Sequence, residues 1–119
     1  MGGYFLKHKL LGFELYYIPS TSMQPALQAE DIVLADTWVD VSTLIPGDII
    51  VFEHPTIHGM RLIKRIAKID TDTVMVLGDN AKNSLDSRSI GNINKQLILA
   101  KASAYIRSCH IGKIADIEN

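Results

Sequence analysis

The sequence predicts a mainly β fold, a small and partly closed antiparallel β-structure of one domain. Two observations carry this prediction. Short runs rich in Val, Ile, Thr and aromatic residues recur along the chain, and turn-forming sequences such as Pro46-Gly47-Asp48 separate them. The length of 119 residues allows one hydrophobic core but not two, and 47% hydrophobic residues is ordinary for a globular protein. We therefore expect a single domain over residues 1–119, with its core within about 13–106.

The expected strands follow one another with short turns between them. Each is a run in which β-branched and aromatic residues dominate, and the runs cover residues 13–18, 31–35, 48–53, 61–69, 73–77 and 97–106. One short helix is expected over 23–29, where Ser22 would cap the first turn. The first backbone N–H groups of such a helix point toward Ser22, which suits a developing oxyanion.

Composition excludes several classes of function. The net charge is −1, and 12 basic and 13 acidic residues are mixed along the chain, so nucleic acid is not expected as a partner. The one cysteine, Cys109, cannot form an internal disulfide. No apolar run approaches the roughly 18 residues that span a bilayer, and no signal peptide is evident. A chain that is complete as written favours the cytoplasm, whereas an anchor removed upstream would indicate the outer face of the cytoplasmic membrane.

Lys64 is a candidate general base. Strand alternation over 60–67 places Met60, Leu62, Lys64 and Ile66 on one face, so the lysine shares an apolar surface. To act as a base near neutral pH, its pKa must fall by about 3 units from about 10.4, which corresponds to roughly 4 kcal/mol. Burial disfavours the ammonium ion and lowers the pKa in this direction. The alternative is an ordinary surface lysine at a strand edge.

Ser22 is the matching candidate nucleophile. It lies between Pro19 and Pro25, which stiffen the backbone around its hydroxyl. The simpler interpretation is a helix N-cap, and a functional serine can also cap. Within the polar segment 83–88, Ser84 is suited to orient Lys64, and Asp86 with Arg88 to form a structural ion pair.

Three other features of the sequence have simpler interpretations or a separate role. His54 and His58 are four residues apart, but Pro55 lies between them and no His-Glu-x-x-His pattern occurs, so no metal site is expected. A Ser/His/Asp triad through either histidine has no support from the spacing. Gly78-Asp79-Asn80 needs no role beyond a hairpin turn. Trp38, within a polar stretch, is predicted to be exposed and to contact a partner.

These residues belong to four ordered motifs. Segment 18–25 (IPSTSMQP) resembles the nucleophile motif of type I signal peptidases, and 63–66 (IKRI) resembles their lysine motif. Residues 78–80 (GDN), followed by 84–88 (SLDSR) and Gly91, are similar to their last motif, and 46–52 (PGDIIVF) is similar to the strand between the first two. Together these motifs cover roughly residues 13–105.

The resemblance implies a Ser/Lys serine endopeptidase that acts through an acyl-enzyme, without metal or cofactor. By motif position, Ser22 would be the nucleophile and Lys64 the base. The Ser20 hydroxyl would join the Ser22 backbone N–H in the oxyanion hole, and Ser84 would orient the lysine. The residues implied in structural support are Asp79, Asn80, Asp86 and Arg88. The substrate would be an extended preprotein or propeptide, cut after small residues, and peripheral membrane contact is left open.

Several positions depart from the family pattern. Ala26 stands where threonine is usual, Glu30 replaces a glycine, Ala81 replaces an arginine, and a Leu-Pro-Gly-Asp sequence after the lysine strand is missing. None of these changes removes a catalytic group. Small relatives of this kind are associated with maturing one dedicated protein, such as nickel-type superoxide dismutase, which is one alternative. The other is a non-catalytic peptide-binding module on the same fold.

Overall fold

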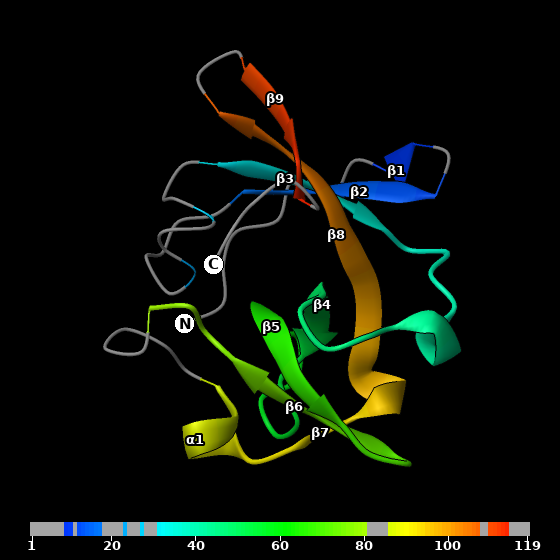
Figure 1. The fold of residues 1–119 in the computed structure, drawn as a ribbon, viewed down its shortest axis with the longest axis vertical. Helices are drawn as coiled ribbons and strands as arrows, with labels where there is room; N and C mark the ends of the chain where they lie inside the picture. The colour runs from blue at the N-terminus through cyan, green and yellow to red at the C-terminus, as the bar shows by residue number, and fades with distance from the viewer. Residues whose placement is uncertain are drawn as a thin grey trace.

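The computed structural model describes residues 9–10, 12–17, 23, 27, 31–80, 86–107 and 110–114. In this part of the chain, nine strands form one sheet (Figure 1). The strands are β1 (Lys9–Leu10), β2 (Phe13–Tyr17), β3 (Ile32–Asp36), β4 (Ile49–Glu53), β5 (Arg61–Ile69), β6 (Thr73–Leu77), β7 (Ile93–Asn94), β8 (Ile98–Arg107) and β9 (His110–Lys113).

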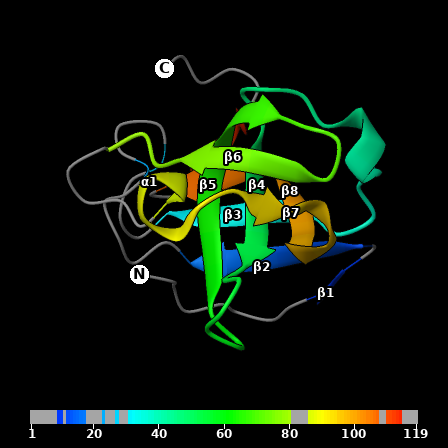
Figure 2. The same cartoon turned by 90° about the horizontal axis from the view of Figure 1, so that it is seen from below.

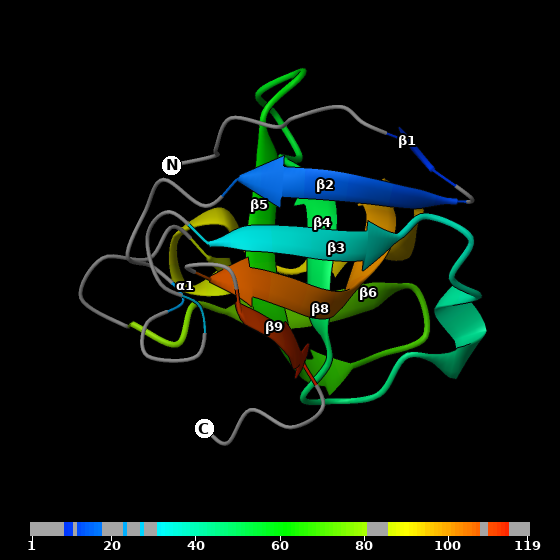
Figure 3. The same ribbon diagram turned by 90° about the horizontal axis from the view of Figure 1, so that it is seen from above.

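The sheet is antiparallel and strongly curled. Its strand order is β1-β2-β3-β8-β4-β5-β6-β7, with β9 added to β8, and every pairing in the described part is antiparallel. Three strands separate β2 from β5 in this order, yet the two run across one another in Figures 2 and 3. The predicted mainly β, partly closed fold is therefore confirmed.

The six predicted strands all form, with ends that move by about one residue. The very short β1 and β7, and β9, were not predicted, because two to four residues carry too little pattern of their own. Short helices at η1 (Val41–Thr43), α1 (Ser87–Ile90) and η3 (Lys95–Leu97) are also additions. In each, the side chain of the preceding Asp or Asn accepts a hydrogen bond from a backbone N–H of the first turn.

The helix expected over 23–29 lies mostly outside the described residues. Of that segment, Met23 and Leu27 are described, and the Leu27 N–H donates to the Met23 carbonyl oxygen at 2.8 Å. This is the i to i+4 hydrogen bond of one helical turn. Among the described helices, none has the length and hydrophobicity needed to cross a membrane.

The core has two parts, one on each face of β4 and β5. Ile49, Val51 and Ile63 belong to one buried cluster, and Ile50 and Phe52 to the other. A strand buried on both faces needs apolar residues at consecutive positions. This explains why 49–52 reads as an unbroken hydrophobic run.

Trp38 is exposed, as predicted: 73% of its surface is accessible. The turn that carries it is held by Thr37, whose N–H and hydroxyl both donate to the Gly12 carbonyl oxygen. Gly12 has φ of 82°, and an added Cβ there would lie 2.3 Å from the indole ring. The indole therefore lies directly against a backbone that only glycine allows. A partner for Trp38 remains a prediction.

Candidate active site

Lys64 is almost completely buried in the middle of β5. Only 1% of its surface is accessible, and Leu62 and Ile66 on the same face are equally buried. Its partner across the β4–β5 ladder is Ile50, which is fully buried. The alternation over 60–67 and the burial of the lysine are confirmed. The surface-lysine alternative is wrong.

Burial lowers the pKa of Lys64 from its ordinary value to about 8. The loss of solvation is the main cause, since it penalises the ammonium ion. The Asp86 carboxylate acts in the opposite direction, and the Arg88 guanidinium lowers the pKa further. At pH 7 about one molecule in ten then holds the neutral amine, compared with fewer than about one in a thousand for an exposed lysine.

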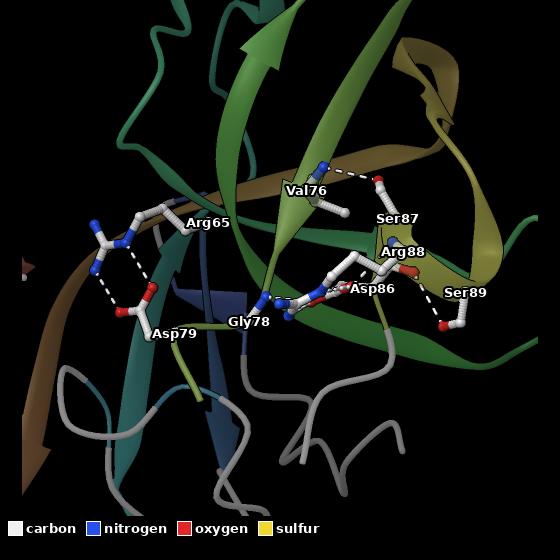
Figure 4. Close-up of polar contacts among 8 residues, drawn as sticks. All are labelled: Arg65, Val76, Gly78, Asp79, Asp86, Ser87, Arg88 and Ser89. Carbon is white, nitrogen blue, oxygen red and sulfur yellow. Dashed lines mark hydrogen bonds and ion pairs between the residues drawn. The ribbon is translucent and has the colours of Figure 1, made fainter. Parts of the chain in front are cut away.

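Asp86 is the buried acid of the site, with no accessible surface. Its carboxylate accepts from the Gly78 N–H at 2.8 Å and from the Arg88 N–H and Nε at 3.0 Å, and it also pairs with Arg88 Nη2 (Figure 4). Beside it, Ser87 Oγ accepts from the Val76 N–H at 2.9 Å. Asp86 and Ser87 thus use side chains to satisfy two N–H groups at the end of β6. The predicted Asp86–Arg88 ion pair is confirmed.

Asp79 forms an ion pair with Arg65, the residue that follows Lys64 on β5. Its two carboxylate oxygens accept from Arg65 Nε at 2.9 Å and Nη2 at 2.8 Å (Figure 4). Arg65 Nη1 also donates to the Gly47 carbonyl oxygen at 2.8 Å. Such a bidentate pair restrains both position and orientation. Gly78-Asp79-Asn80 is therefore more than a turn. The described contacts assign no role to Asn80.

The three predicted serines, Ser20, Ser22 and Ser84, lie outside the described residues. Two described residues mark the path of the chain near them. Met23 and Leu27 are both buried, and they belong to the same core cluster as Ile63, the residue before Lys64.

Two ladders of the sheet are shorter than the strands that form them. The ladder between β5 and β6 covers residues 65–69, so in the described part β6 does not extend along residues 61–64. Likewise, β1 pairs with Phe13 and Glu14 and does not extend along residues 15–17 of β2. Strand edges of this kind can accept an added peptide strand.

Sequence reasoning missed a polar cluster between β2 and β5, formed by Glu14, Tyr16 and Arg61. The Tyr16 hydroxyl donates to Glu14 Oε2 at 2.8 Å, and Arg61 Nη1 lies 3.3 Å from both oxygens. Glu14 and Tyr16 share one face of β2 because they are two residues apart. The two-residue spacing could have indicated that Glu14 and Tyr16 lie together. Their partner Arg61 could not be identified from the sequence, because it is 47 residues from Glu14.

His54 has a structural role in the β4–β5 hairpin. Its Nδ1 accepts from the N–H groups of Thr56 at 3.1 Å and Ile57 at 3.0 Å, so the ring proton is on Nε2. Among the described residues, no group of three or more His, Cys, Asp and Glu side chains is arranged to hold a metal ion.

Replacing His54 separates this capping role from simple packing. His54→Ala should lower the free energy of unfolding by about 1–2 kcal/mol, because two partly buried hydrogen bonds to the hairpin turn are lost. His54→Asn should retain most of the stability, since an Asn oxygen can accept from the same N–H groups. Urea unfolding of the three proteins measures the difference. Equal losses in both variants would show that the Nδ1 hydrogen bonds contribute nothing specific.

Comparisons with known proteins identify the family of this chain. The family model described as signal peptidase, peptidase S26, matches residues 5–74 and 67–106. Mitochondrial inner membrane protease subunit 2 of Saccharomyces cerevisiae is 31% identical over 111 residues, covering 71% of this chain and 63% of the relative. Signal peptidase I of Buchnera aphidicola is 35% identical over 75 residues, and that of Aquifex aeolicus 40% over 62.

The coverage differs between the two sides of these matches. The bacterial alignments cover 52% and 51% of this chain but 24% of each relative. The chain thus spans less than two thirds of the length of these relatives. The family match itself extends over most of the chain, in agreement with the four ordered motifs. The chain belongs to the signal peptidase family, peptidase S26.

Proposed function

We propose that this protein is a serine endopeptidase that uses Ser22 and Lys64 to cleave signal peptides or N-terminal propeptides after small residues. The single observation that carries the proposal is the buried Lys64, whose pKa is lowered to about 8. A lysine in that state can accept a proton near neutral pH. Family membership supplies the reaction class.

The neutral Lys64 amine takes the proton from the Ser22 hydroxyl as the Ser22 oxygen attacks the scissile carbonyl carbon. The resulting oxyanion is stabilised by the Ser22 backbone N–H and the Ser20 hydroxyl. Lys64 then gives its proton to the leaving amine, which breaks the peptide bond and leaves an acyl-enzyme. Water, deprotonated by Lys64, hydrolyses the ester, and Ser84 orients the amine throughout. The location of Met23 in the same core cluster as Ile63 supports the approach of Ser22 to this strand.

The polar residues around Lys64 are positioning residues in this scheme. Arg65 and Asp79 restrain β5 directly after the base. Asp86 connects the end of β6 to α1, on either side of the segment that contains Ser84. This frame resists displacement of the base during the reaction, which depends on sub-ångström geometry.

An extended substrate fits the strand edges beside Lys64. A peptide added along residues 61–64 of β5 would form backbone hydrogen bonds independent of its sequence, and pockets for alternate side chains would select small residues. The same edges favour the second candidate, a module that binds peptides without cutting them.

Ser22→Ala tests the proposal. Cleavage of a peptide with small residues at the first and third positions before the cut should fall by at least about a thousandfold, because the nucleophile is lost. Binding of that peptide, measured by fluorescence anisotropy, should persist. Lys101→Gln is the matched control and should cleave normally, because it changes a residue of β8 that has no part in the proposed mechanism and removes only its ion pair with Asp48. Binding without cleavage by the unmodified protein would favour the binding module.

A further inference from the structure

A buried carboxylate lies where the chain enters β3, four residues after Leu27. Asp31 has 1% of its surface accessible, and Val33, on the same face of the strand, is fully buried. Val33 belongs to the core cluster that also contains Met23 and Leu27. The Asp31 carboxylate is therefore on the face of β3 that covers these two residues of the segment carrying Ser22.

Arg107, the last residue of β8, pairs with Asp31 through two hydrogen bonds. Arg107 Nε donates to Asp31 Oδ1 at 2.9 Å and Arg107 Nη2 to Oδ2 at 2.7 Å, so one planar group fixes both carboxylate oxygens. The two residues lie just beyond the Ile32–Ile106 pair, at one end of the β3–β8 ladder. They are 76 residues apart in the sequence. The ion pair therefore joins the start of β3 to the end of β8.

The β8–β9 hairpin supports the Arg107 side chain. Its guanidinium carbon lies 4.8 Å from the centre of the Tyr105 ring, and Tyr105 packs against the same core cluster. On β9, Gly112 pairs with Tyr105, and an added Cβ on Gly112 would lie 2.3 Å from the ring. The three strands β3, β8 and β9 lie side by side in Figure 3. The ring is thus held between the hairpin backbone and the core, and it limits the movement of Arg107.

The burial of Met23 and Leu27 does not by itself fix the position of a neighbouring nucleophile. Apolar contacts have no preferred direction, whereas a bidentate ion pair restrains both position and orientation. The Leu27 N–H donates to the Met23 carbonyl oxygen at 2.8 Å, so the two residues move as one helical turn. Asp31 is the nearest described residue after this turn, and its ion pair supplies the directional restraint.

We propose that Asp31 and Arg107 are positioning residues, which anchor the Met23–Leu27 turn and thereby hold Ser22 against Lys64. This inference rests on the proposed function, because it takes Ser22 as the nucleophile. Arg107 acts through Asp31 and the chain that leads to the turn. Loss of the ion pair therefore slows the chemical step through misplacement of the nucleophile, and it leaves the substrate-binding strand edge unchanged.

The kinetic test measures kcat and KM separately for a peptide with small residues before the cut. Arg107→Gln should lower kcat by about tenfold and change KM by less than about twofold, because a small displacement of the nucleophile affects the chemical step. Arg107→Lys keeps a cation beside the buried Asp31 carboxylate, so it should fold even if Arg107→Gln does not. It should still lower kcat severalfold, since an ammonium group lacks the planar fork of arginine.

Lys101→Gln is the matched control, because it breaks another ion pair of the same strand. It should leave both kcat and KM unchanged. If kcat in both Arg107 variants equals that of the unmodified protein, the inference is overturned.

Hydrogen exchange separates this inference from the proposed function, because it requires no cleavage. In the Arg107 variants the Leu27 amide should exchange at least about fivefold faster, through local opening of the turn. The Val51 amide, on a strand paired on both sides, should change much less. This selective result supports the anchoring even if the unmodified protein cuts nothing and the proposed function fails. Equal acceleration at Leu27 and Val51 would indicate a merely structural role and overturn the inference, as would unchanged exchange at Leu27.

Discussion

Replacing Lys64 with methionine is expected to abolish peptide cleavage and, at the same time, to stabilise the folded protein at pH 7. Methionine has nearly the length of lysine and suits the apolar surroundings of Leu62 and Ile66. The native lysine at pH 7 is mostly charged in a site that disfavours the charge. Removing that penalty stabilises the fold, whereas removing the amine leaves Ser22 without a base.

The sign of the effect follows from proton linkage. The pKa of Lys64 is about 8 in the folded protein, against an ordinary value of 10.5. Between these values the unfolded chain binds more protons, so stability rises with pH. Below about pH 8 the unmodified protein lacks this contribution, which amounts to about 3 kcal/mol. The advantage of Lys64→Met should therefore be largest below pH 8 and should shrink as the pH approaches 10.5.

Urea unfolding of both proteins at pH 7 and pH 9.5 measures this change. Lys101→Gln serves as the control, because it removes a lysine whose side chain is 42% exposed. A constant difference between Lys64→Met and the unmodified protein at both pH values would contradict the lowered pKa. Cleavage that survives in Lys64→Met would rule out the Ser/Lys mechanism.

Asp86→Asn and Arg88→Gln should shift the pH profile of kcat/KM in opposite directions. Asp86 raises the pKa of Lys64, and Arg88 lowers it. Without the Asp86 charge, the base titrates at lower pH and the acidic limb of the profile moves below pH 8. Without the Arg88 charge, the limb moves above pH 8. Both variants break the same ion pair, so loss of structure alone cannot produce opposite shifts.

The two variants should also differ in stability. Asp86 is fully buried, whereas the Arg88 side chain is 46% exposed. Asp86→Asn should lower the free energy of unfolding by about 2–4 kcal/mol, because a buried acceptor of several hydrogen bonds is weakened. Arg88→Gln leaves a buried carboxylate that the Gly78 and Arg88 N–H groups still satisfy, so its loss should be smaller. Shifts of the pH profile in one common direction would show that Asp86 and Arg88 do not act through the charge of Lys64.

The part of the site within one strand could be predicted because strand alternation is local. A run from 61 to 69 is enough to place Leu62, Lys64 and Ile66 together, and β5 has those bounds. The Asp86–Arg88 pair is also local, since the two residues are two positions apart. By contrast, the four residues of α1 are too few to show a periodic pattern, and the Asp86 cap stabilises its first turn. The Ser87 and Asp86 side chains accept hydrogen bonds from the N–H groups of Val76 and Gly78. No short window of sequence relates these residues to one another.

Long-range pairs were beyond sequence reasoning for a different reason. By sequence alone, Arg65 could pair with any of several carboxylates. It pairs with Asp79 because the turn at the end of β6 brings that carboxylate beside it. Arg61 meets Glu14 only because the sheet curls through the intervening strands. Such contacts depend on the accumulated twist and register of the sheet, and these are properties of the assembled strands rather than of any one segment.

The sequence by itself determined the mainly β fold, the family, and a lysine placed among apolar neighbours, because each of these depends on residue patterns within one segment or on the order of motifs. Only the tertiary structure decided how far the pKa of Lys64 falls and which groups oppose that fall. That value depends on the burial of the amine away from water and on the Asp86 and Arg88 charges. Desolvation and charge interactions are set by the packing of several strands around one amine, which a linear pattern does not contain.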